Sequence, residues 1–141
     1  MTDIEQLTSA DEKSCVEINA LLAQLSKERE CTLEHLKKVV KNSTSELWVA
    51  IKDGNIVGMA TLALIVKPAG VTVQLEDVVV DESARGQGLG RKLCEKVIER
   101  AKVRGASSIH LTSRPSREAA NVLYQKLGFV RKETNVYRMT L

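Results

Sequence analysis

Aromatic residues are scarce in this chain of 141 residues, where Trp48, Tyr124, Phe129 and Tyr137 form the whole set. Proteins that bind nucleic acids by base stacking usually expose more aromatic rings than this. The net charge of +3 is also too small to argue by itself for a nucleic-acid partner. We therefore expect no nucleic acid among the ligands of this chain.

Long apolar runs are absent as well. The longest candidate, residues 59–66, has the length of a strand, whereas a membrane-spanning helix needs about 18 apolar residues. The first fifteen residues contain four acidic side chains and no apolar stretch, so they do not resemble a signal peptide. The expectation is no membrane partner and a cytoplasmic location.

Cysteine and histidine are too sparse for a disulfide framework or a metal site. Cys15, Cys31 and Cys94 form no C-x-x-C pair, and His35 and His110 are isolated from one another. We therefore predict no metal, and we interpret the cysteines as small packing residues.

What the chain does contain fits one compact domain over residues 1–141. Apolar residues make up 43% and charged residues 28%, which is ordinary for a soluble globular protein. This apolar content suffices for one sizeable core, so disorder of the whole chain is excluded.

The hydrophobic pattern predicts a mixed α/β fold with about four helices. Ser9, with Glu12 in a capping box, and Thr32 are the expected N-caps of two helices near the N-terminus. Asp53-Gly54 predicts a tight hairpin, and residues 71–112 have the length of a crossover between parallel strands. Strands are expected over residues 4–8, 47–51, 56–66, 71–80, 107–112, 129–131 and 136–139, and two later helices over 88–104 and from the N-cap Ser116 to 127.

A glycine-rich turn between an apolar strand and a helix is the most specific feature. First-turn N–H groups lack intrahelical partners, the helix dipole adds partial positive charge, and glycines let a phosphate approach. Residues 85–104 include seven basic and two acidic side chains, a net charge of +5. We predict an anion site here; a helix start without a ligand and a solvated basic face are the alternatives. The segment comprises Val78, Val79 and Val80, then Arg85, Gly86, Gln87, Gly88, Leu89, Gly90 and Arg91.

Two common nucleotide-binding motifs are excluded. The phosphate loop G-x-x-x-x-G-K-[ST] does not occur. The dinucleotide motif G-x-G-x-x-G fails because Arg91 and Leu93 stand where its last glycine would be.

Two sequence blocks identify a family instead. The first, Arg85-x-x-Gly88-x-Gly90, fits the pattern [QR]-x-x-G-x-[GA]. The second is Asn121-x-x-Tyr124-x-x-Leu127-Gly128-Phe129. With these blocks in this order, the chain resembles the GNAT family of N-acetyltransferases over about residues 46–130, and elsewhere only in the order of its elements.

The resemblance implies a mostly antiparallel sheet in which the parallel fourth and fifth strands splay apart. Acetyl-CoA, the implied co-substrate, would lie in that gap, between residues 75–80 and residues 109–113. Main-chain groups of Val78 and Val80 would pair with the pantetheine amides, as an added strand does. The implied coenzyme-binding residues are Val78, Val79, Val80, Arg85, Gly86, Gln87, Gly88, Leu89, Gly90, Arg91, Asn121 and Tyr124.

The resemblance also implies direct attack of an amine on the thioester in a ternary complex. Tyr124 would be the general acid near the sulfur; the alternative is a core tyrosine packed on Phe129. Glu76 would be the base, directly or through water, with Asp77 less favoured, although a bulge in the fourth strand would exchange their faces. His110 would act only if it reached in from the fifth strand. The N–H of Val78 would stabilise the oxyanion.

The implied function is acetylation of the primary amine of a small molecule. Acetylation of a protein lysine or N-terminus, and coenzyme A binding without catalysis, stay open as alternatives. Residues 26–30, 67–70 and 132–135 are the loops expected to face the acceptor. Arg114 and Arg117 would bind an acidic group of the substrate or simply lie at an exposed helix start. A homodimer through the strand edge of residues 136–141 is an open alternative to a monomer.

Overall fold

The computed structural model describes residues 2–141, which divide into two compact units. The larger unit ends at Leu111 and the smaller one covers Thr112–Leu141. One domain over the whole chain therefore stays a prediction. Within residues 2–141, no helix has both the length and the apolarity that crossing a membrane requires.

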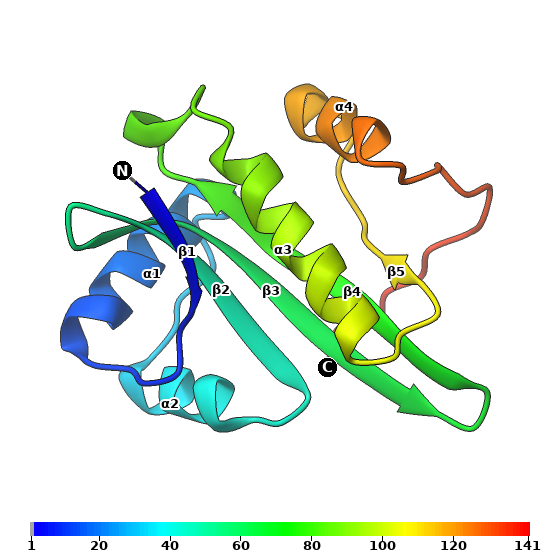
Figure 1. The fold of residues 1–141 in the computed structure, drawn as a ribbon, viewed down its shortest axis with the longest axis horizontal. Coiled ribbons are helices and arrows are strands. Elements are labelled where there is room, and N and C mark those ends of the chain that lie inside the picture. Colours follow the sequence, from blue (N-terminus) through cyan, green and yellow to red (C-terminus); the bar gives the residue numbers. More distant parts are fainter. Residues whose placement is uncertain (1) are drawn as a thin grey trace. The chain divides into compact units, whose positions relative to one another are not determined.

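The larger unit is built on one five-stranded sheet with the order β1-β2-β3-β4-β5 (Figure 1). Neighbouring strands are antiparallel from β1 to β4, and β5 is parallel to β4. The predicted mixed sheet is confirmed. Its strands are β1 (Thr2–Gln6), β2 (Ser45–Lys52), β3 (Asn55–Lys67), β4 (Gly70–Val80) and β5 (Ile109–His110).

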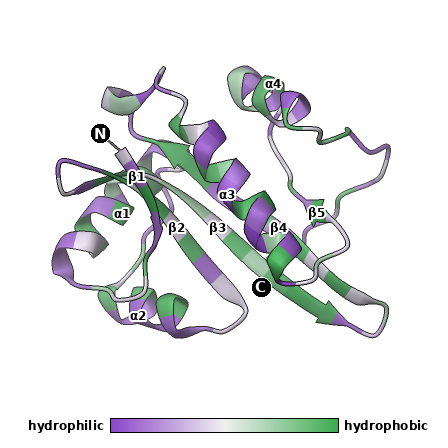
Figure 2. Ribbon diagram, in the orientation of Figure 1, coloured by the Kyte–Doolittle hydropathy of each residue, from purple (hydrophilic) through white to green (hydrophobic). Residues whose placement is uncertain are grey.

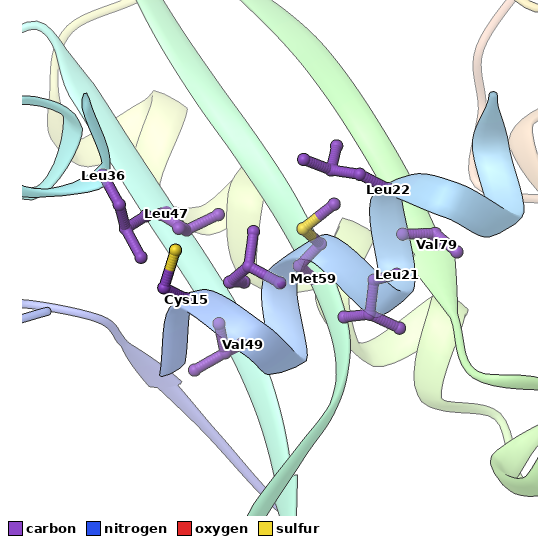
Figure 3. Packing of buried hydrophobic residues seen from close by; sticks show 9 residues of the cluster. Cys15, Leu21, Leu22, Leu36, Leu47, Val49, Met59 and Val79 are labelled. Carbon is purple, nitrogen blue, oxygen red and sulfur yellow. The ribbon is translucent and has the colours of Figure 1, made fainter. Parts of the chain in front are cut away.

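Helices cover both faces of this sheet. Along β2, alternation sends Leu47 and Val49 towards α1 (Glu12–Leu25) and α2 (Leu33–Lys41), and sends Glu46 and Trp48 towards α3 (Leu89–Val103). Figure 2 shows hydrophobic and hydrophilic residues alternating along α3, as expected for a helix with one buried side. Figure 3 shows the core on the other face, formed by Cys15, Ile18, Leu21, Leu22, Leu36, Leu47, Val49, Met59 and Val79.

Gly58 of β3 allows α3 to lie close to the sheet. A Cβ atom at this position would lie 3.2 Å from Leu93 Cδ1 and 3.4 Å from Ala50 Cβ. A larger residue at position 58 would therefore push α3 away from the strands.

Local sequence signals predicted several turns and caps correctly. Asp53 and Gly54 both have positive φ, 52° and 78°, as a two-residue hairpin requires. Thr32 caps α2 by accepting a hydrogen bond from the backbone N–H of His35 at 3.0 Å. The predicted cap of α1 is wrong, because its N-cap is Asp11, whose carboxylate accepts from the Ser14 N–H at 2.8 Å.

The smaller unit contains α4 (Glu118–Lys126). The predicted N-cap Ser116 is wrong: Arg117 occupies that position and makes no side-chain cap bond. The strands predicted over residues 129–131 and 136–139 are also wrong, because residues 129–141 carry no helix or strand. Val136, Tyr137 and Met139 are all exposed, so this segment has no buried face, and it pairs with no strand within residues 2–141.

A buried carboxylate fixes the C-terminal half of α3 to the sheet. Glu46 is 2% exposed and accepts from Arg100 Nε at 2.9 Å, from Arg104 Nη1 at 2.6 Å and from Trp48 Nε1 at 2.9 Å. Burial by itself raises the pKa of Glu46, but the hydrogen bonds from Arg100, Trp48 and Arg104 together lower it to about 2. Glu46 is therefore ionised near neutral pH and ties two arginines of α3 to β2.

We expect Glu46→Gln to lower the free energy of unfolding by about 3 kcal/mol near neutral pH, because it leaves two guanidinium groups without their charge partner. Urea unfolding measures this loss. The control is Glu99→Gln, which removes an exposed ion pair with Lys96 and should cost less than about 1 kcal/mol.

The same pair of proteins tests the pKa. The pKa of Glu46 is lower in the folded chain than in the unfolded chain, so its contribution is complete above the unfolded value and is lost as pH falls through about 2. The stability gap between wild type and Glu46→Gln should therefore narrow between about pH 5 and pH 2. A gap that stayed constant over that range would contradict the assignment.

Candidate functional site

The segment after β4 forms a glycine turn that leads directly into α3. Asp81 caps the short 3-10 helix η1 (Glu82–Ala84) by accepting from the Ser83 N–H at 3.0 Å. Gly86 and Gly88 then have φ of +79° and +75°, in the left-handed region that favours glycine. Gly88 is the N-cap of α3 and provides no side-chain hydrogen bond. The first turn of α3 therefore starts without a capping side chain.

The geometry of this turn fits an anionic ligand. Gly86 and Gly88 are exposed, and no heavy atom lies within 4 Å of a Cβ built on either glycine. Their conformation and the open space above them leave room for phosphate oxygens to approach the backbone N–H groups. Lys52, at the end of β2, adds a positive charge here, because its Nζ lies 3.4 Å from Gln87 Oε1.

The side chain of Arg85 supports the turn by a hydrogen bond to the end of β4. Its Nε donates to the carbonyl oxygen of Val80 at 3.0 Å, so this side chain folds back onto the end of β4. The arginine of the sequence motif therefore shapes the loop.

Gln24, near the end of α1, holds the same loop from the side. Its Nε2 donates to Asp81 Oδ1 at 2.7 Å, and its Oε1 accepts from the Glu82 N–H and from Arg85 Nη2, both at 3.3 Å. Hydrogen bonds from Ser83 and then from Gln24 lower the pKa of Asp81. Sequence reasoning missed Gln24, because a polar residue on a helix carries no sign of its partner.

β4 has a bulge at the two candidate bases. Glu76 pairs with Thr61 and Val79 pairs with Met59. Between these two pairs, β4 therefore has one more residue than β3. Asp77 has a φ of +51° within the bulge. The extra residue places Glu76 and Val79 on the same face of the sheet, the one covered by α1 and α2. The anticipated bulge is therefore present, but the change of face falls on Val79 and not on Glu76, which keeps the face set by its pairing with Thr61.

The two carboxylates have different surroundings. Glu76 is exposed, whereas Asp77 forms an ion pair with Arg29, which lies between α1 and α2. Because Asp77 is already engaged with a guanidinium group, the geometry favours Glu76 as the group that meets an amine.

The parallel pairing of β4 with β5 is short. It joins Val73 to Ile109 and Gln74 to His110, and β4 continues to Val80 after β5 has ended. Of the strand predicted over residues 107–112, only Ile109 and His110 form a strand in the structure. The His110 ring is engaged locally, since its Nε2 lies 2.9 Å from Ser108 Oγ.

The smaller unit carries the second sequence block. Tyr124 is buried, and its ring meets Phe129 edge-on with the ring centroids 6.0 Å apart. Asn121 Nδ2 donates to the carbonyl oxygens of Arg114 and Arg117, both at 2.9 Å. The packing of Tyr124 on Phe129 is therefore present, and its acid role stays a proposal.

One buried hydroxyl in the smaller unit lacks a partner. Ser113 Oγ, which follows β5 in the chain, makes no hydrogen bond within residues 2–141. A buried polar atom without a partner indicates a position where a ligand or water supplies one.

Two of the three cysteines, Cys31 and Cys94, are poor nucleophiles. Burial raises the pKa of Cys94 to about 11 and also raises the pKa of Cys31, so both thiols stay protonated near neutral pH. Among the described residues, no three His, Cys, Asp or Glu side chains gather as metal ligands would.

Known proteins resemble this chain in sequence and in fold. Human N-acetylaspartate synthetase is 38% identical over 90 residues, which cover 64% of this chain and 29% of that protein. Glucosamine 6-phosphate N-acetyltransferase 1 of Oryza sativa subsp. japonica is 34% identical over 71 residues, 50% of this chain and 41% of that protein. The crystal structure of a Trypanosoma brucei acetyltransferase superposes with a TM-score of 0.81 at 28% identity, covering 100% of both chains.

The chain spans only 29% of the length of the human relative, so the match concerns one part of that protein. The model of the acetyltransferase (GNAT) family matches residues 11–129, most of the chain. Proteins of this family use acetyl-CoA as the acetyl donor. By its sequence and its fold, the chain belongs to the acetyltransferase (GNAT) family.

Proposed function

We propose that this chain transfers an acetyl group from acetyl-CoA to the primary amine of a small molecule, by direct attack in a ternary complex. The observation that carries the proposal is the exposed glycine turn at the start of α3, in a chain that belongs to this family. Acetyl-CoA supplies the activated thioester, and the residues of the chain bind it and manage the protons.

The coenzyme would be held mainly by backbone groups. N–H groups from Gly86 to Arg91 bind the pyrophosphate, with Lys52 as an added cation. On the pattern of the family, we assign Val78, Val79 and Val80 to the pantetheine side, together with Asn121. Because Asn121 Nδ2 donates within its own unit, its Oδ1 is the atom that would accept from a pantetheine amide.

The reaction needs a neutral amine, a stabilised oxyanion and a proton for the leaving thiolate. We assign the first task to Glu76, which takes the proton of the substrate ammonium directly or through water. The N–H of Val78 stabilises the oxyanion. Tyr124 donates a proton to the leaving thiolate of coenzyme A.

The names of the two curated relatives favour a small acceptor. They refer to N-acetylaspartate and to glucosamine 6-phosphate, which are small molecules. Acetylation of a protein and coenzyme binding without catalysis are the alternatives that the following measurements separate.

Thiol release from acetyl-CoA, measured with small amines and short peptides, tests the activity, and a coenzyme titration tests binding. We expect turnover with one class of small amine. Turnover with peptides alone would favour protein acetylation, and tight binding without turnover would favour a binding module.

We expect Gly88→Ala to weaken coenzyme binding by about tenfold, because a left-handed alanine costs on the order of 1 kcal/mol and shifts the turn. The matched control is Gly105→Ala, since Gly105 has a φ of +77° at the other end of α3. Both variants should lose similar stability, and only Gly88→Ala should lose affinity. Equal affinities would contradict the assignment of the turn.

Glu76→Gln should lower kcat by about 100-fold and remove the fall of kcat/KM at low pH, because the amide cannot accept the proton. Asp77→Asn is the control and should keep the pH profile of the wild type. An unchanged pH profile in Glu76→Gln would show that another group is the base.

Tyr124→Phe should lower kcat by about 100-fold while the chain stays folded, because the ring that packs on Phe129 is retained. The exposed Tyr137, changed to phenylalanine, is the control. If the rate of Tyr124→Phe equalled that of the wild type at every pH, Tyr124 would not be the acid.

A further inference from the structure

We propose that Arg29 is a specificity-determining residue that selects amine acceptors carrying an anionic group, a carboxylate or a phosphate. This inference rests on the proposed function, since it concerns the amine that Glu76 would deprotonate.

The segment that carries Arg29 is held in place on both sides. At its end, the Cys31 N–H donates to Asn19 Oδ1 at 2.7 Å, and Asn19 Nδ2 donates to the Cys31 carbonyl oxygen at 2.8 Å. At its start, the Arg29 N–H donates to the carbonyl oxygen of Ser26 at 3.3 Å. The guanidinium group is therefore presented by a defined loop anchored on α1, which reduces the entropy lost when it binds a ligand.

The present partner of Arg29 shows which chemistry it accepts. Its guanidinium pairs with the Asp77 carboxylate, and the two side chains are 49% and 30% exposed. An ion pair this open to solvent contributes at most about 1 kcal/mol, so another anion can replace Asp77 at small cost. Guanidinium groups bind carboxylates and phosphates through paired, charge-assisted hydrogen bonds.

Arg29 pairs with the residue that follows the candidate base in β4. Asp77 follows Glu76 directly in β4, and Cα atoms of consecutive residues are about 3.8 Å apart. Thr61, which pairs with Glu76, and Gln74 lie on the same face of the sheet as Glu76, and both are half-buried. We infer that one small acceptor can meet both groups, with its ammonium at the Glu76 carboxylate and its anion at the guanidinium that Asp77 now holds.

The test uses matched acceptors. Each member of a set of amino acids is compared with its own amide, and each of several hexosamines with its 6-phosphate. We measure kcat and KM by thiol release, and acceptor binding by titration calorimetry of the coenzyme A complex. The wild type should prefer the anionic member of a pair by at least about tenfold. The class of pair that shows the preference distinguishes carboxylate from phosphate.

Arg29→Gln should abolish this preference by raising KM for the anionic members, with kcat and the neutral members unchanged. Arg29→Lys should retain part of the preference, because it keeps the charge but loses the paired hydrogen bonds. The control is Lys37→Gln, which removes an exposed positive charge from α2, outside the loops expected to face the acceptor, and should keep the preference.

Three results would overturn the proposal. The wild type could treat both members of every pair alike, or Arg29→Gln could weaken both members equally, as a purely structural role predicts. Either of these two results would remove only the role of Arg29. Coenzyme binding with neither turnover nor binding of any amine would remove the proposed function and this inference together.

Discussion

The buried pairing of Glu46 with Arg100 and Arg104 is the interaction on which the arrangement of the larger unit depends. It fixes the C-terminal half of α3 on β2, while the close approach of Leu93 to Gly58 fixes the other half on β3. A helix held at two points on a sheet has a defined starting position. The glycine turn must therefore span the short distance from the end of β4 to that position, and its backbone N–H groups are oriented before any ligand arrives.

The bulge in β4 is the second constraint, and it separates two neighbouring carboxylates by their surroundings. In a regular strand, Glu76 and Asp77 would point to opposite faces. Here Glu76 keeps the face of α1 and α2, while the extra residue holds Asp77 in a left-handed conformation that aspartate tolerates and brings Val79 to the same face as Glu76. The Arg29 guanidinium then engages Asp77, while the Glu76 carboxylate remains exposed.

Local patterns predicted the parts of this site that depend on neighbours in sequence. The glycine turn, the Asp53-Gly54 hairpin and the cap at Thr32 follow from backbone conformation and short-range hydrogen bonds, and all are present. Gln24 and Arg29 were missed as contacts, because their partners lie 57 and 48 residues away and alternation specifies a face without specifying a partner. The closing strands were overpredicted for the same reason, since alternation in residues 136–139 does not show which strand would pair with it.

The contacts that fix the larger unit differ in kind from those around its candidate site. Glu46 is buried and paired with two arginines, so separating α3 from the sheet would leave charges uncompensated. The hydrogen bonds of Gln24 to the segment before the glycine turn are exposed, and so is the ion pair of Arg29 with Asp77. Exposed contacts of this kind exchange with water at small cost. Gln24 lies in α1, and Arg29 lies in the segment that follows α1. α1 therefore carries both Gln24, which holds the segment before the glycine turn, and Asn19, which anchors the loop that presents Arg29.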